Sequence, residues 1–284
     1  MTNNPKLSIV IPWCDRDEVQ RTFLHNRTIF RECEAEVLII NCGGDLHRLR
    51  RCLASIELEM LRVIEIPRPT FNKSLAINIG VHSSRSPRLF VLDADICLNR
   101  NFISEAVSHL EREAFVTIGR IYESESKHNY VTSALSRDLK GEFVTSLSLG
   151  NFIQISFADG TSVELRHPED PFDNSRCAPG LIFANIDHIA SIQGYNSDLE
   201  GWGWEDDDVQ LRLRKVLGLA HVEIGEALHL SHGDERRALF GASRWSSNIS
   251  NFRLACRRYS LGDFHGTYSI DISTWKNKIR EVRF

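Results

Sequence analysis

Two carboxylates, one residue apart, end an apolar stretch in the first third of the chain. Residues 88–92 have the composition of a buried β-strand, and Asp93 and Asp95 follow that strand directly. Open α/β sheets bind their ligands at the carboxyl ends of strands, and carboxylate oxygens suit divalent cations. Because such pairs also end ordinary solvent-facing strands, the pair alone predicts a metal site only weakly.

A second acidic cluster begins the segment 205–217, whose apolar residues recur at helical spacing. Glu205, Asp206, Asp207 and Asp208 would then occupy the first turn of that helix. Carboxylates favour a helix N-terminus, so capping is one explanation. Four consecutive acids exceed what capping needs, however, and the preceding Gly201-Trp-Gly-Trp204 is typical of a loop that faces a sugar. We therefore favour a functional role for this cluster.

Two histidines, His229 and His232, lie three residues apart at the end of an apolar segment. A histidine in an apolar strand is often an ordinary core residue. Downstream of an Asp-x-Asp pair and an acidic helix start, a metal-binding role is about equally well supported, because imidazole and carboxylate together suit Mn²⁺.

The elements that must position these residues alternate regularly through the first 121 residues. Strands that alternate with helices at this spacing predict a mostly parallel sheet covered on both faces. The expected strands are 7–11, 36–40, 61–66, 88–92, 114–121 and 181–185, and the expected helices are 15–31, 45–58, 72–81, 101–113, 187–192, 205–217 and 246–259.

The alternation breaks after residue 121. The chain is polar to about 149, and residues 152–157 and 162–165 then predict a β-hairpin with a glycine-containing loop. The proline-rich segment 167–179 predicts a further loop. Such an insertion either shapes an acceptor pocket or is a surface elaboration.

The distribution of charge argues against a nucleic-acid-binding protein. The chain has 284 residues and a formal charge of −4, which divides into −9 before residue 241 and +5 from there to the end. The main body is therefore not built to attract nucleic acid. The basic end predicts an accessory segment that contacts an anionic partner or a membrane surface peripherally.

The seven cysteines are scattered and never form a Cys-x-x-Cys motif, which indicates free thiols in a reducing compartment. No leader sequence or membrane-spanning run is recognisable. We expect a cytoplasmic protein.

The order of the motifs resembles metal-dependent glycosyltransferases of the GT-A fold, in particular the β-1,4-galactosyltransferase and chondroitin polymerase group. The resemblance covers roughly residues 7–234. The matching segments are Ile11-Pro12-Trp13 with Arg16, Phe71-Asn72-Lys73 with Asn78-Ile79-Gly80, Asp93-Ala94-Asp95, Trp202-Gly203-Trp204-Glu205-Asp206 and His229-Leu-Ser-His232.

The resemblance implies an inverting enzyme that moves a hexose or N-acetylhexosamine, of galactose or GalNAc type, from a UDP-sugar to a hydroxyl of a carbohydrate or other acceptor. It assigns Asp206 as the catalytic base beside Glu205, and Asp95, His232 and His229 as ligands of Mn²⁺ or Mg²⁺. The donor would be bound by Pro12, Trp13, Arg16, Phe71, Lys73, Asp93 and Ala94. The acceptor or sugar would be bound by Trp202, Gly203, Trp204 and Gly180.

Three positions depart from the family's pattern. Trp204 stands where the family has a glycine, Lys73 replaces an arginine, and His229 stands where the family often has methionine, so the metal preference can differ. The expected division is a GT-A domain over 1–240, with a nucleotide-sugar half (1–121) and an acceptor half (122–240), followed by a basic helical extension over 241–284.

Two other functions remain open. A nucleotidyltransferase acting on a sugar phosphate would also use an acidic metal site, but residues 11–15 lack the glycine-rich loop that it normally needs. A catalytically inactive nucleotide-sugar-binding module would be expected to lose the base or a metal ligand, whereas each of these positions is occupied.

Overall fold

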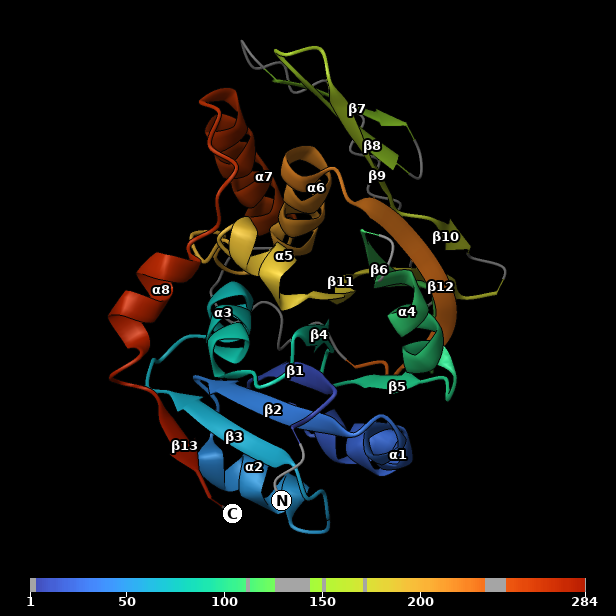
Figure 1. Cartoon of the computed structure of the whole chain (residues 1–284), viewed down its shortest axis with the longest axis vertical. Coiled ribbons are helices and arrows are strands. Elements are labelled where there is room, and N and C mark those ends of the chain that lie inside the picture. Colours follow the sequence, from blue (N-terminus) through green and yellow to red (C-terminus); the bar gives the residue numbers. More distant parts are fainter. Residues whose placement is uncertain are drawn as a thin grey trace.

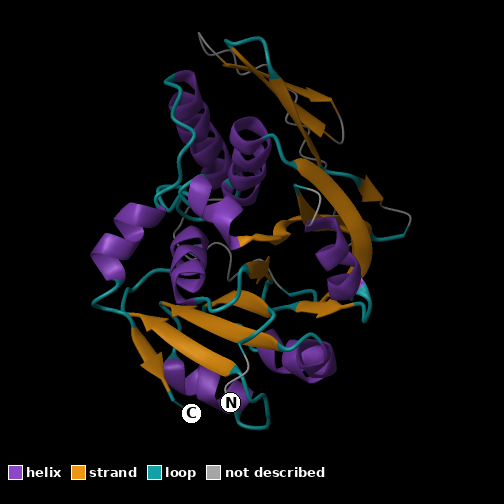
Figure 2. Ribbon diagram, viewed as in Figure 1, coloured by secondary structure: helices purple, strands orange, loops and turns teal. Residues whose placement is uncertain are grey.

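A computed structural model describes residues 4–110, 113–125, 144–149, 152–170, 173–232 and 244–283. Its centre is a ten-stranded sheet with helices on both faces (Figures 1 and 2), which confirms the predicted α/β class. The order of the strands is β13-β3-β2-β1-β4-β11-β6-β12-β5, with β10 paired to β11 outside this path.

The first half of the chain builds the parallel part of the sheet. Strands β1 to β4 run parallel to one another, because β1, β2 and β3 are each followed by a helix that returns the chain to the same end of the sheet. The elements of this half are β1 (Leu7–Trp13), α1 (Glu18–Glu32), β2 (Ala35–Cys42), α2 (Leu46–Leu53), β3 (Leu61–Ile66), α3 (Lys73–Ser83), β4 (Arg88–Val91), β5 (Ile96–Leu98), α4 (Phe102–Leu110) and β6 (Ala114–Glu123).

Local signals place the helix starts. Asn72 caps α3 by accepting a hydrogen bond from the Leu75 backbone at 2.8 Å, and Asp45 caps α2 by accepting one from His47 at 2.8 Å. The α3 cap matters most for the site, because it fixes Lys73 as the first residue of its helix.

Alternation along the strands divides the core into two layers. In β1, Ile9 and Ile11 pack with α1, α2 and α4, whereas Val10 faces α3, α5 (Ile186–Ser191) and α6 (Glu205–Leu217) on the other face. Both faces of the sheet are therefore buried, which explains why its strands read as continuous apolar runs.

The second half inserts strands of mixed direction. β11 (Ser175–Asn185) runs antiparallel between β4 and β6, and β12 (Ala220–His229) runs parallel to β6 and antiparallel to β5. β10 (Glu169–Asp170) adds a short antiparallel pairing to β11. The sequence predicted only the last part of β11, since its first residues include Pro179 and polar side chains.

The predicted hairpin is confirmed, and it belongs to a separate three-stranded sheet. β8 (Phe152–Phe157) pairs antiparallel with both β7 (Val144–Leu149) and β9 (Ser162–Arg166). Apolar side chains of β8 and β9 pack with α6 and with α7 (Arg244–Ser260), so the insertion is joined to the rest of the fold through a third apolar cluster.

The end of the chain is part of the fold, which contradicts the expectation of an accessory segment. β13 (Arg280–Val282) pairs with the edge strand β3, and α8 (Tyr268–Trp275) packs against α3. Arg258 and Arg280 are paired with Asp263 and Glu65, which reduces the charge left for an external anion. The boundary at residue 240 remains a prediction.

In the parts of the chain that the structure describes, no helix combines the length and the apolar character that crossing a membrane requires.

Candidate active site

The two acidic motifs and the histidine pair meet at the end of the sheet that is formed by the carboxyl ends of its parallel strands, where β4 ends. Asp93 and Asp95 lie in the turn between β4 and β5, and the antiparallel pairing of β5 with β12 places His229 opposite Ile96. The Leu230 backbone donates to the Asp95 carbonyl at 2.8 Å and continues this connection. These backbone contacts bring the side chains of Asp95 and His232, which are 137 positions apart in the sequence, within 3.1 Å of each other.

Asp95, His229 and His232 form a buried group that could hold a metal ion. The Asp95 Oδ2 atom lies 3.1 Å from Nε2 of His232 and 3.5 Å from Nε2 of His229. One ligand atom from each of the three residues lies within 4.8 Å of the others. Two imidazole nitrogens and a carboxylate oxygen fit a divalent cation such as Mn²⁺, as the sequence predicted.

The charges in this group are mutually stabilised. Burial alone would raise the pKa of Asp95, but its hydrogen bonds with His229 and His232 outweigh burial and lower that pKa well below its ordinary value. Burial would lower the pKa of His229, yet its hydrogen bonds with Asp95 and Glu123 raise it. The carboxylate is therefore ionised, as a metal ligand must be.

Glu123, at the end of β6, is a site residue that the sequence did not reveal. Its Oε2 atom accepts hydrogen bonds from Nδ1 of His229 at 2.6 Å and from the Ser231 hydroxyl at 2.8 Å, and Arg176 donates to its Oε1 at 2.8 Å. With Nδ1 bonded to Glu123, Nε2 of His229 is the nitrogen that faces Asp95. A carboxylate behind a histidine ligand fixes the ring's orientation.

Lys73 joins the Asp-x-Asp motif to the acidic helix. Its Nζ atom lies 2.9 Å from Oδ2 of Asp206 and 3.2 Å from Oδ1 of Asp93. Burial would lower the pKa of Lys73, but Asp206 and Asp93 outweigh burial and raise it well above 10.5. The lysine is therefore a fixed positive charge between the strand end and the first turn of α6.

Glu205 and Asp206 are largely withdrawn from solvent, and each keeps one carboxylate oxygen without a hydrogen-bond partner, Oε2 and Oδ1 respectively. Burial and the neighbouring Asp206 charge raise the pKa of Glu205 to about 8. Burial also raises the pKa of Asp206, against the opposing effect of Lys73. A buried carboxylate oxygen without a hydrogen-bond partner destabilises the folded state. Such oxygens in a site are positioned to bind a ligand.

Gly180, in β11, makes the Lys73–Asp206 contact possible. A Cβ atom at this position would lie 2.4 Å from Oδ2 of Asp206 and 2.7 Å from Nζ of Lys73. The sequence assigned Gly180 to the sugar; in the structure its backbone packs against the charged pair.

The other two acids of α6 have structural partners. Asp208 is 1% exposed and binds Nε of Arg212 at 2.9 Å and the Tyr259 hydroxyl at 2.6 Å, so its carboxylate is used in the core. Asp207 pairs with His167 at 2.7 Å and raises the pKa of that histidine. Only Glu205 and Asp206 are therefore left for the site.

The residues predicted to bind the donor lie on the β1 and α3 side of the same edge, but not all of them are accessible. Trp13 is 1% exposed, and its Nε1 atom donates to the Arg16 carbonyl at 2.8 Å, which places the indole in the core rather than against a nucleotide. Pro12 and Ala94 are buried, whereas Arg16 and Phe71 are half-buried.

The predicted sugar-binding loop is only partly available. Trp204 is 4% exposed and packs edge to face on Phe252, with ring centroids 4.5 Å apart, so it belongs to the core and its predicted sugar contact is wrong. Trp202 is half-buried, and Gly203 has a φ of +99° that favours glycine. Trp202 remains the aromatic candidate for a sugar contact.

Comparisons with known proteins match two family models to this sequence. The sequence model described as glycosyl transferase family 2 matches residues 8–163, and the model described as the N-terminal domain of galactosyltransferase matches residues 160–232. The two matches together span all the motifs discussed above.

Two individual proteins are also similar. The chain is 22% identical over 203 residues to polypeptide N-acetylgalactosaminyltransferase 3 of Drosophila melanogaster, covering 69% of this chain but only 30% of that protein. A mannosyltransferase from Pyrobaculum calidifontis, solved with GDP-mannose and Mn²⁺, is 13% identical with a TM-score of 0.49, covering 98% of this chain and 76% of the other. Since the family 2 match extends over more than half of the sequence, the chain belongs to glycosyl transferase family 2 and is a glycosyltransferase with a GT-A type fold.

Proposed function

We propose that this enzyme is a metal-dependent, inverting glycosyltransferase that moves a hexose or N-acetylhexosamine from a UDP-sugar to an acceptor hydroxyl. The observation that carries the proposal is the pairing of two groups at one edge of the sheet. The Asp95–His229–His232 group suits a divalent cation, and the Lys73-bound Asp206 offers a carboxylate for proton transfer.

Asp206 is the proposed general base. A free alcohol is a poor nucleophile at neutral pH, and a carboxylate that removes its proton during attack increases the rate. The acceptor oxygen forms a bond to C1 of the sugar, the bond from C1 to the diphosphate oxygen breaks, and its electron pair leaves with the diphosphate. The acceptor proton passes to Asp206, whose raised pKa makes it a stronger base than an exposed aspartate. A single displacement of this kind inverts the configuration at C1.

Asp95, His229 and His232 would hold the cation, which supplies positive charge for the diphosphate leaving group. Lys73 is a second positive charge at the same edge, beside the half-buried Phe71. In this proposal Lys73 and Arg16 contact the donor's phosphates, and Glu205 and Trp202 contact the acceptor or the transferred sugar.

The choice of a galactose or GalNAc donor rests on similarity. The galactosyltransferase match covers residues 160–232, and the named relative transfers N-acetylgalactosamine. The chain spans about 30% of that relative's length, so its polypeptide acceptor is not carried over here. A cytoplasmic location and an anionic contact through the basic end also stay proposals.

The test is a donor panel of UDP-galactose, UDP-GalNAc, UDP-glucose, UDP-GlcNAc and GDP-mannose, assayed for release of the nucleoside diphosphate with Mn²⁺, with Mg²⁺ and with excess chelator. We expect a UDP-hexose or UDP-N-acetylhexosamine to turn over only when a divalent cation is present. Full turnover in chelator would exclude metal dependence, and the absence of turnover with every donor would favour an inactive binding module.

A further inference from the structure

The C-terminal segment holds the loop that leads into the acidic start of α6. Two side chains of α7 contact this loop through its backbone. Asn251 Nδ2 donates to the carbonyls of Glu200 at 3.0 Å and Gly203 at 2.8 Å, and the Ser247 hydroxyl accepts from the Trp202 backbone at 3.0 Å. Asn251 is only 5% exposed, so these bonds form away from competing water.

The loop needs external support because the backbone of Trp204 is strained. Trp204 directly precedes Glu205 and has a φ of +69°, whereas Gly201 and Gly203, at +81° and +99°, are glycines that adopt a positive φ readily. A tryptophan rarely adopts the left-handed region, because its Cβ atom then lies too close to the following carbonyl oxygen, and such a conformation persists only when its surroundings fix it. The contacts of Trp204 with Phe252, and of Gly203 with Asn251, both come from α7.

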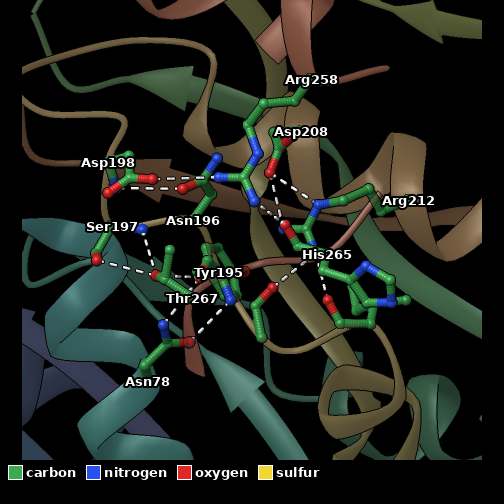
Figure 3. Close-up of polar contacts among 12 residues, drawn as sticks. Asn78, Tyr195, Asn196, Ser197, Asp198, Asp208, Arg212, Arg258, His265 and Thr267 are labelled. Carbon is green, nitrogen blue, oxygen red and sulfur yellow. Dashed lines mark hydrogen bonds and ion pairs between the residues drawn. The ribbon is translucent and has the colours of Figure 1, made fainter. Parts of the chain in front are cut away.

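A second set of contacts fixes the preceding residues of the same loop (Figure 3). Thr267 donates to the Tyr195 carbonyl at 3.2 Å and accepts from the Ser197 backbone at 2.8 Å. Arg258 pairs with Asp198 at 3.3 Å. Tyr195, Ser197 and Asp198 are therefore also bound to α7 and to the residue that begins α8.

The last of these contacts, at Gly203 and Trp204, come directly before the two acids that face the site. A shift of the Gly203 carbonyl would move the Trp204 peptide and with it the first turn of α6. Asp206 and Glu205 lie in this turn, and Lys73 and Gly180 leave little room for the Asp206 carboxylate to adjust. A displacement of about 1 Å far from the reacting atoms can cost roughly 100-fold in rate.

We propose that α7 is a positioning element for the catalytic carboxylates, and that Asn251 is its main positioning residue. The proposal rests on the function proposed above, since it assumes that Glu205 and Asp206 take part in transfer. It assigns to the basic C-terminal segment a role in catalysis in place of the accessory role that its charge suggested.

The test compares Asn251→Asp with Asn251→Ala and with the control Arg253→Ala, which changes an exposed side chain of the same helix. Asn251→Asp keeps the size of the side chain but replaces its donor group with an acceptor that faces two carbonyls. We expect kcat for transfer to fall about 10- to 100-fold in both Asn251 variants, with donor KM and Mn²⁺ affinity unchanged within about twofold. Arg253→Ala should match the wild type.

Hydrogen exchange supplies the readout that is independent of activity. Backbone amides of 199–206 should lose protection in Asn251→Asp, whereas those of β1 to β4 should not change. Unchanged kcat together with lost protection would overturn the positioning role, and unchanged protection would overturn the contact itself. A wild type that transfers no sugar would instead refute the proposed function, and the exchange result would still decide whether Asn251 holds the loop.

Discussion

Lys73 and Asp206 form an ion pair of 2.9 Å that joins the first residue of α3 to the first turn of α6. The same lysine lies 3.2 Å from Asp93, so one cation connects the Asp-x-Asp motif with the proposed base. The sequence assigned Lys73 to the donor alone. Its contact with Asp206 indicates that donor binding and base position depend on the same side chain.

Replacing Lys73 by methionine should therefore affect both binding and rate. Lys73→Met keeps the length of the side chain but leaves Asp206 and Asp93 without their cation. We expect kcat/KM for the donor to fall about 100-fold and the free energy of unfolding to fall by about 1–3 kcal/mol. Steady-state kinetics and urea unfolding measure the two effects. Lys276→Met, at an exposed position, is the control, and equal losses in both variants would contradict a specific role.

Gly180→Ala tests the space around the same pair. The added methyl group would meet Asp206 Oδ2 at 2.4 Å and Lys73 Nζ at 2.7 Å, so one of these side chains must move. We expect transfer activity to drop at least about tenfold while the protein stays folded. Gly119→Ala, where the nearest atom is 3.5 Å away, is the matched control. Wild-type kinetics in Gly180→Ala would show that the pair's geometry is not needed.

Glu123→Gln should weaken metal binding although Glu123 is not itself a proposed ligand. The amide can turn its NH₂ toward Nδ1 of His229, which allows the ring to change tautomer and lose its fixed orientation. We expect Mn²⁺ affinity, measured by calorimetry on the protein without donor, to fall about 10- to 100-fold. Ser231→Ala removes the hydroxyl contacts with Glu123 and with the Glu125 backbone but leaves the bond between Glu123 and His229, so it should have a smaller effect. An unchanged affinity in Glu123→Gln would remove Glu123 from the site.

Glu205 predicts a dependence of stability on pH. Its pKa is about 8 in the folded protein and ordinary in the unfolded chain, so the folded state binds the extra proton between these values. The free energy of unfolding should therefore decrease as pH rises through this window, and Glu205→Gln should remove that part of the decrease. Urea unfolding of both proteins between about pH 5 and about pH 9 measures the difference. If the free energy of unfolding changed with pH in the same way in the wild type and in Glu205→Gln, the pKa of Glu205 would not be raised by folding.

The sequence predicted the elements better than the directions of the side chains. The apolar runs of β1, β2 and β4 identified the parallel sheet, because both of its faces are buried. Trp13 was assigned to the nucleotide from its motif, yet it has the same parity along β1 as Ile9 and Ile11 and therefore enters the core beneath α1. This alternation was present in the sequence and could have corrected the assignment.

Other errors depended on contacts between distant segments. Trp204 is buried by Phe252 of α7, and Asp208 by Tyr259 of the same helix, and no local pattern predicts these partners. Glu123 reaches His229 only through the register of β6 with β12. The i, i+4 pairing of Asp208 with Arg212 was the one signal that could have separated Asp208 from the functional acids.

The central claim is that Asp206 removes the acceptor proton, and the most direct measurement is the transfer rate of Asp206→Asn with saturating donor and Mn²⁺. We expect kcat to fall about 10²- to 10⁴-fold, with the affinities for UDP and Mn²⁺ unchanged. Asparagine keeps the shape of the side chain and can still contact Lys73, so the loss would report the missing base. Transfer at a rate close to that of the wild type would contradict the assignment and would make Glu205 the next candidate.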